Sequence, residues 1–152
     1  MIIASNIEKS YGPQSLFEEV SFLINKGERV GLVGKNGTGK STLFKMILGQ
    51  ESIDSGALST PKGYRIGALE QHIHFTQPTV LQECIEALPV EKQWDHYKAE
   101  IILSGLGFSE QDFQKDPSTF SGGFQVRINL CKALLADPNM LLLDEPTNYL
   151  DI

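Results

Sequence analysis

A glycine-rich loop that separates an apolar run from a helical pattern constrains this sequence more than any other feature. Residues 34–41 read Gly-Lys-Asn-Gly-Thr-Gly-Lys-Ser and fit the pattern G-x-x-x-x-G-K-S/T. Residues 29–33 are mostly apolar and predict a strand that is covered on both faces. After the loop, Leu43, Met46 and Ile47 recur at helical spacing. A strand, a tight loop and a helix in this order indicate an α/β fold.

The loop contains the residue types that a chain of phosphates needs. Glycines let backbone N–H groups close around phosphate oxygens, and the following helix presents the positive end of its dipole. We expect Lys40 to reach the β- and γ-phosphate oxygens and the Ser41 hydroxyl to bind Mg²⁺. At average glycine usage, a chance match over a chain of this length is well below about 1%. The expected ligands are therefore ATP and Mg²⁺.

A second apolar run ends in two carboxylates. Met140–Leu143 predicts a buried strand, and Asp144 and Glu145 follow it directly. Ligands of α/β sheets bind at the carboxyl ends of strands. We expect Asp144 to bind Mg²⁺, directly or through water, and Glu145 to be the catalytic residue that polarises the attacking water. This signal is weak alone, because many strands end in Asp, and becomes informative when it is paired with the loop.

The order of these motifs identifies a family. Phe120-Ser121-Gly122-Gly123 opens a helical pattern that runs to Leu135, Gln71 follows a predicted strand, and Tyr11 lies upstream of the loop. Over essentially the whole chain this arrangement resembles the ATP-binding-cassette (ABC) family. The resemblance implies an α/β, ABC-type P-loop NTPase with a mixed sheet core, an antiparallel β subdomain and a small helical subdomain. We expect residues 1–152 to be a partial ABC domain, with its core at 1–71 and 119–152 and its helical subdomain at 72–118.

The resemblance also implies roles for individual residues. Tyr11 looks like the aromatic residue that stacks on adenine, and a π-face does not by itself choose adenine over guanine. Gln71 looks like the Q-loop glutamine, a contact to Mg²⁺ and water. Ser121 and the glycines after it would bind the γ-phosphate of an ATP that a second ABC domain holds. The expected nucleotide-binding residues are Tyr11, Gly34, Lys35, Asn36, Gly37, Thr38, Gly39, Lys40, Ser41, Thr42, Gln71, Ser121, Gly122 and Gly123, and the expected metal ligands are Ser41, Gln71 and Asp144.

Within the family, the details resemble ABC-F proteins, which carry two ABC domains on one chain and partner with the ribosome. Residues 144–151 are similar to their Walker B and D-loop stretch, where the partner domain is met, and residues 120–127 are similar to the signature of their first domain. In the common signature, Leu and Gln stand where this chain has Phe120 and Phe124. We expect the contact to the partner's phosphate to survive these two differences.

The spacing of the motifs leaves alternatives open. Ser121 follows Gln71 by only 50 positions, whereas ABC-F first domains usually carry a helical arm there, so the arm is absent or a segment near residues 88–91 is left out. That spacing favours one alternative, the nucleotide-binding subunit of a membrane transporter. A second alternative is an ATP-binding module without turnover. The family's switch histidine is expected downstream of Ile152, so we expect residues 1–152 alone to hydrolyse ATP weakly.

Composition argues against several other classes. The net charge of −6 disfavours direct non-specific binding to DNA or RNA by this segment. The longest apolar runs are far shorter than the ~20 residues that span a bilayer, and no signal-peptide pattern opens the chain. We therefore expect a cytoplasmic location without membrane insertion. Cys84 and Cys131 have no metal-site spacing and are expected to be reduced, apolar residues.

Overall fold

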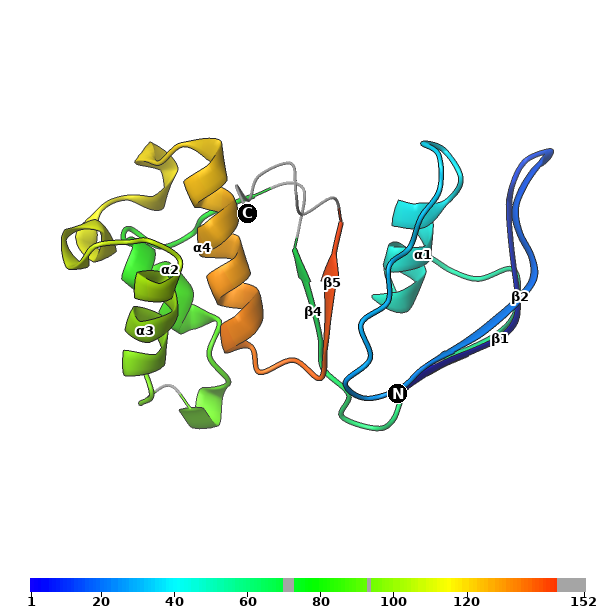
Figure 1. Ribbon diagram of the computed structural model, residues 1–152, viewed down its shortest axis with the longest axis horizontal. Coiled ribbons are helices and arrows are strands. Elements are labelled where there is room, and N and C mark those ends of the chain that lie inside the picture. The colour runs from blue at the N-terminus through cyan, green and yellow to red at the C-terminus, as the bar shows by residue number, and fades with distance from the viewer. Residues whose placement is uncertain (70–72, 93, 145–152) are drawn as a thin grey trace. The chain divides into compact units, whose positions relative to one another are not determined.

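The computed structural model describes residues 1–69, 73–92 and 94–144 (Figure 1). The chain divides into two compact units, Met1–Tyr64 and Arg65–Ile152, and each is described by itself. Among the described residues, no helix has the length and apolar character required to cross a membrane.

The first unit contains a three-stranded antiparallel sheet. Its strands β1 (Ile2–Tyr11), β2 (Gln14–Ile24) and β3 (Ser55–Ser59) lie in the order β2-β1-β3. Strands β1 and β2 form one long hairpin whose turn is Gly12-Pro13. The expected antiparallel β part of the fold is therefore present.

Helix α1 (Lys40–Ile47) follows the glycine-rich loop, as the sequence predicted. Its buried residue Met46 packs in one apolar cluster with Ala4 and Ile7 of β1, and Leu43 and Phe17 pack against this cluster. Burial of this helical face against the sheet removes apolar surface from water. The packing places the start of α1, and with it the glycine-rich loop, within the first unit.

Residues 29–33 form no strand, so the prediction of a strand covered on both faces is wrong for the structure described. The Val33 side chain is 94% exposed, and Val30 and Leu32 are exposed too. A strand requires a neighbour that completes its hydrogen-bond ladder. Within the first unit, β1 pairs only with β2 and β3, and no strand pairs with residues 29–33. An apolar run indicates that a segment can form a strand, but it does not indicate whether a partner strand is available.

The second unit combines a small parallel sheet with helices. Strands β4 (Ile66–Leu69) and β5 (Met140–Leu143) pair in parallel, with Leu69 opposite Leu143. The helices are α2 (Val80–Glu86), α3 (Tyr97–Gly105) and α4 (Gly122–Leu135), with short 3₁₀ helices at Val90–Lys92, Glu110–Gln114 and Pro117–Thr119. Helix α4 and strand β5 have the predicted bounds.

The core of the second unit lies among its helices. Figure 1 shows α4 between the parallel strands on one side and the helices α2 and α3 on the other. Helix α4 contacts α2, α3 and β4. The side chains of Val80, Cys84, Leu103, Ile128 and Cys131 are fully buried in one cluster. Both cysteines are free thiols, as expected. Helix α4 thus joins the helical part of the unit to the strand that leads to Asp144.

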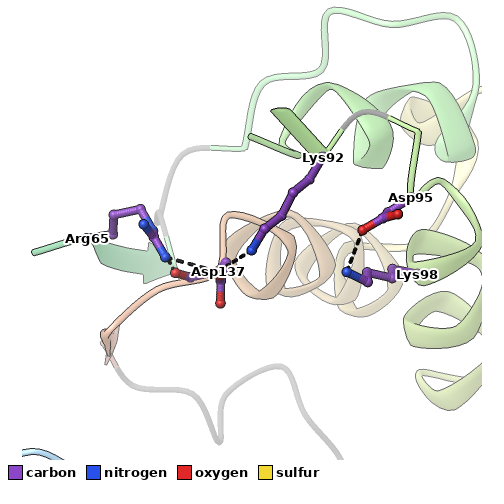
Figure 2. A network of polar contacts seen from close by, with 5 residues as sticks. All are labelled: Arg65, Lys92, Asp95, Lys98 and Asp137. Atoms are coloured by element: carbon purple, nitrogen blue, oxygen red, sulfur yellow. Dashed lines mark hydrogen bonds and ion pairs between the residues drawn. The ribbon is translucent and has the colours of Figure 1, made fainter. Parts of the chain in front are cut away.

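A polar network fixes the connection between α4 and β5 (Figure 2). The Arg65 side chain donates to the Asp137 carbonyl over 2.8 Å and to its carboxylate over 3.0 Å, and Lys92 reaches the same carboxylate at 2.7 Å. The hydrogen bond and positive charge of Lys92 hold the pKa of Asp137 below its ordinary value. Arg65 and Asn139 also exchange hydrogen bonds through their backbones and the Asn139 side chain. The connection before β5 is therefore tied to the start of β4.

Candidate functional site

The glycine-rich loop has left-handed backbone at Gly37, with a φ of 81°, and at Gly39, and it is closely packed at Gly34 and Gly39. Gly39 has a φ of 95°, and a Cβ added to it would lie 2.8 Å from the Phe17 ring. A Cβ on Gly34 would lie 2.7 Å from the Thr38 Oγ1 atom. Left-handed backbone and close approach both exclude a side chain. The loop is therefore wound tightly against its own residues and against β2.

Helix α1 begins directly at the end of this loop. Its N-cap residue is Gly39, which provides no side chain to cap the first N–H groups. The Leu43 N–H donates to the Gly39 carbonyl over 2.8 Å, so hydrogen bonding within the helix starts there. The first turn of an α-helix directs its N–H groups outward at the positive end of the helix dipole, which suits an anion.

The side chain of Lys40 folds back over the loop. Its ammonium donates to the carbonyl oxygens of Gly34, over 2.8 Å, and Lys35, over 3.0 Å. The Thr38 hydroxyl also donates to the Lys35 carbonyl, over 2.8 Å. Lys35 and Asn36 are exposed at the tip of the loop. A positive charge and directed N–H donors therefore belong to the same eight-residue segment, which is the chemistry that phosphate oxygens require.

Tyr11 stands at the end of β1 and is half exposed. Burial of its hydroxyl and the neighbouring Glu51 carboxylate raise the pKa of Tyr11, and Thr42 in the first turn of α1 offsets part of this rise. The Lys9 ammonium lies 5.1 Å from the centroid of the Tyr11 ring. The structure therefore brings together two residues that the sequence predicted separately, Tyr11 and Thr42.

A second helix N-terminus lies at the Ser-Gly-Gly segment of the second unit. Ser121 is the N-cap of α4, has an extended backbone and makes no side-chain capping hydrogen bond, and Gly122 and Gly123 form the first turn. The Gln125 side chain donates to the carbonyls of Phe120, over 2.9 Å, and Ser118, over 3.2 Å, and holds the approach to the helix. The exposed Ser121 and the first turn of α4 thus suit an external anion.

The two residues that depart from the common signature pack away from this helix end. Phe108 contacts Phe120 and Phe124 edge to face, with centroid distances of 5.5 and 5.1 Å. The Arg127 guanidinium lies 4.9 Å from the Phe124 ring and donates to the Leu106 carbonyl. Aromatic pairs of this geometry add to the stability of a core. The substitutions therefore strengthen the contact between α4 and the helical core and leave Ser-Gly-Gly unchanged.

Asp144 directly follows β5, as the sequence predicted. Because β4 and β5 are parallel and in register from Ile66 to Leu69, their carboxyl ends lie at one edge of the sheet. Gln71, Glu145 and residues 148–151 lie outside the described part of the chain, and so do the roles expected of them. Ser41 belongs to the first unit and Asp144 to the second.

Sequence reasoning missed the buried charged residues. Lys9 is 5% exposed, and the Glu83 side chain is fully buried. One signal could have found Lys9, because it lies two positions after the buried Ile7 and so on the same face of β1. Its partners Glu51 and Asp54 lie more than forty residues away, and no local pattern reveals such a pairing.

The sequence model of the ABC transporter family matches residues 17–148, so this chain belongs to the ABC family of ATP-binding domains. The order of motifs and the fold described above agree with that membership.

Two curated relatives are similar to nearly all of this chain. The energy-dependent translational throttle protein EttA of Escherichia coli K12 is 40% identical over 151 residues, which cover 97% of this chain and 27% of EttA. The probable ATP-binding protein YheS of the same organism is 31% identical over 182 residues, which cover the whole chain and 29% of YheS. The chain thus spans less than a third of the length of these curated relatives. The predicted likeness to ABC-F proteins is confirmed, because EttA belongs to that group.

Solved structures confirm the fold. The dimeric structure of MJ0796, a bacterial ABC transporter cassette, superimposes with a TM-score of 0.79 at 25% identity, over 99% of this chain and 76% of that one. The structure of an ATP-binding subunit of an ABC transporter superimposes with a TM-score of 0.80, also at 25% identity, over 99% of this chain and 68% of that one. The predicted ABC-type α/β class is therefore confirmed.

Proposed function

We propose that this chain is the ATP-binding part of an ATPase that binds ATP with Mg²⁺ and hydrolyses it together with a second ABC domain. The observation that carries the proposal is the tight loop at the start of α1, which combines an uncapped helix N-terminus with the Lys40 ammonium. This combination offers directed donors and a positive charge to a triphosphate.

Each part of the first unit has a separate role in this proposal. The backbone of residues 34–39 surrounds phosphate oxygens, Lys40 offsets the charge of the β- and γ-phosphates, and Ser41 and Thr42 continue the first turn of the helix. Tyr11 stacks on the base, and its half-exposed ring is available for that contact. The same residues would accept GTP through the same contacts, because none of them reads the edge of the base.

The residues proposed for Mg²⁺ are Ser41, Gln71 and Asp144. A hydroxyl, an amide carbonyl and a carboxylate supply only oxygen ligands, which this hard ion prefers. When bound, Mg²⁺ offsets negative charge on the phosphate oxygens. Glu145 is the proposed base, which takes a proton from the water that attacks the γ-phosphate.

A second ABC domain is the proposed partner across the Ser-Gly-Gly segment. The exposed first turn of α4 offers N–H groups and the Ser121 hydroxyl to a γ-phosphate that another domain holds. The dimeric form of the MJ0796 cassette supports such a pairing. We propose that residues 148–151, the D-loop stretch, meet the same partner domain.

The ribosome is the proposed target of the whole protein. The relation to EttA, named as a translational throttle protein, supports an ABC-F protein that acts in translation in the cytoplasm. The second candidate is the nucleotide-binding subunit of a transporter, which the likeness to transporter cassettes and the short spacing from Gln71 to Ser121 favour. In either case we propose a core at residues 1–71 and 119–152 and a helical subdomain at 72–118.

The phosphate-binding part of the proposal is tested by titration with a fluorescent ATP analogue. Charged hydrogen bonds contribute roughly 1.5–3 kcal/mol, so Lys40→Ala should weaken binding by about one to two decades. Lys45→Ala is the matched control, because Lys45 is an exposed lysine in the last turn of the same helix. The control should bind like the parent. Equal affinity of the folded Lys40→Ala variant and the parent would reject the assignment of the loop.

A further inference from the structure

We infer that Lys9 is a positioning residue for the nucleotide base: its buried ammonium, paired with Glu51, fixes the Tyr11 ring beside the first turn of α1. This inference rests on the proposed binding of ATP, and it adds a residue that does not itself touch the nucleotide. All three residues belong to the first unit.

The Lys9 ammonium is buried and paired with two carboxylates. It lies 2.7 Å from Glu51 Oε1 and 3.4 Å from Asp54 Oδ1. Asp54 is itself fixed, because its carboxylate accepts from the Ser10 N–H over 2.8 Å and its own N–H donates to the Glu8 carbonyl over 2.9 Å. A buried lysine needs such partners, since desolvation of an unpaired charge is costly. The position of the ammonium is therefore set by a closed group of contacts.

This ammonium and one of its partners hold Tyr11 from two sides. The distance of 5.1 Å from the Lys9 Nζ atom to the ring centroid is within the range of a cation–π contact. The Tyr11 hydroxyl lies next to Glu51, the carboxylate that pairs with Lys9, and next to Thr42, and both side chains act on the pKa of the hydroxyl. The ring and the hydroxyl are thus restrained separately. A tyrosine at the end of a hairpin strand would otherwise lose rotamer freedom when a base stacks on it.

The position of Tyr11 beside Thr42 relates Lys9, Glu51 and Tyr11 to the proposed phosphate site. Thr42 follows Ser41 in the first turn of α1, next to the residues proposed to bind phosphate and Mg²⁺. The ring that receives the base therefore lies next to a side chain of the helix end that receives the phosphates. Lys9 supports base binding by holding the ring in place before ATP arrives, and it has no role in the binding of phosphate alone.

Binding of ATP and of inorganic tripolyphosphate, measured by calorimetry on the parent and on Lys9→Met, separates these two effects. Lys9→Met keeps much of the length and apolar volume of the side chain and removes the charge. We expect ATP affinity to fall about three- to tenfold, as for loss of a partly desolvated cation–π contact and of ring order, with tripolyphosphate affinity unchanged. Lys9→Arg should recover most of the loss. Equal losses for both ligands would overturn the inference, and so would unchanged ATP affinity.

A double-substitution cycle provides the second readout. Lys9 acts only through the ring, so Lys9→Met should weaken ATP binding no further when Tyr11→Ala is already present. Losses that multiply would contradict the positioning role. If Lys9→Met does not fold, as circular dichroism would reveal, Glu51→Gln takes its place in both measurements with the same expected selectivity for ATP. A parent that binds neither ligand would reject the proposed function itself, whereas a parent that binds both with an unaltered Lys9→Met would reject only this inference.

Discussion

The buried carboxylate of Glu83 is expected to stabilise the second unit more than any other charged group described there. Its Oε2 atom accepts from the Thr76 N–H over 2.9 Å and from the Gln77 N–H over 2.8 Å, and its Oε1 atom accepts from the Lys132 ammonium. Burial alone would raise the pKa of Glu83, but Lys132 and the two N–H groups outweigh it and hold that pKa below the ordinary value. Glu83 thereby joins the segment before α2 to α4.

The contribution of Glu83 to the free energy of unfolding can be estimated for the substitution Glu83→Gln. Glutamine has one acceptor oxygen, which can serve the two N–H groups, but its NH₂ group then faces the ammonium of Lys132. One charge-assisted hydrogen bond is lost, worth roughly 1.5–3 kcal/mol. Water can replace only part of this lost hydrogen bond to Lys132, because the Lys132 side chain is 27% exposed. We expect the free energy of unfolding to fall by about 1.5–3 kcal/mol, or roughly 3–12 °C in Tm for a domain of this size.

Thermal and urea unfolding followed by circular dichroism measures this loss. Glu86→Gln is the matched control on the same helix, because Glu86 is exposed and accepts from the side chains of Thr76 and Gln77. An exposed contact of this kind should cost less than about 1 kcal/mol. If Glu83→Gln were as stable as the parent, or lost no more than Glu86→Gln, the reasoning from the buried carboxylate would be refuted.

Three further outcomes are expected. Lys115 and Ser109 lower the pKa of Asp112 from 3.8 to about 2. The contribution of Asp112 to stability is therefore present at neutral pH and is lost as the pH falls through that range. The unfolding midpoints of the parent and of Asp112→Asn should converge by pH 2. Gly39→Ala should weaken ATP binding in a fluorescence titration, because of its φ of 95° and the Phe17 ring, whereas Gly31→Ala, which meets nothing within 4 Å, should not. Tyr11→Ala should lose similar affinity for ATP and GTP, on the order of 1–3 kcal/mol, and a loss for ATP alone would indicate readout of the base edge.

Elements with a local signal could be predicted from the sequence. Helix α1 follows glycines that leave its N-terminus open, and α4 begins with the glycine pair after Ser121, so their starting points were predictable. Strand β5 combined an apolar run with a carboxylate at its end.

Features that depend on contacts distant in the chain could not be predicted. The charged partners of Lys9 and Glu83 lie about forty to fifty residues away, and a single sequence contains no record of such pairings. The apolar run at residues 29–33 has the composition of a buried strand but no partner strand within its own unit. The packing of Phe120 and Phe124 against Phe108 likewise explains the unusual signature only once the helices are in place.

Co-sedimentation with ribosomes, for the parent and Glu145→Gln of the whole protein, tests the proposed ATPase and its target together. A general base typically contributes about 10²–10⁴-fold, so Glu145→Gln should lose turnover to that extent and keep its affinity for ATP. The ATP-loaded form should then accumulate. We predict that Glu145→Gln is enriched in the ribosome pellet with ATP and not with ADP, and that the parent is released. Loss of turnover without enrichment in the ATP pellet would contradict a ribosomal target and favour the transporter subunit instead.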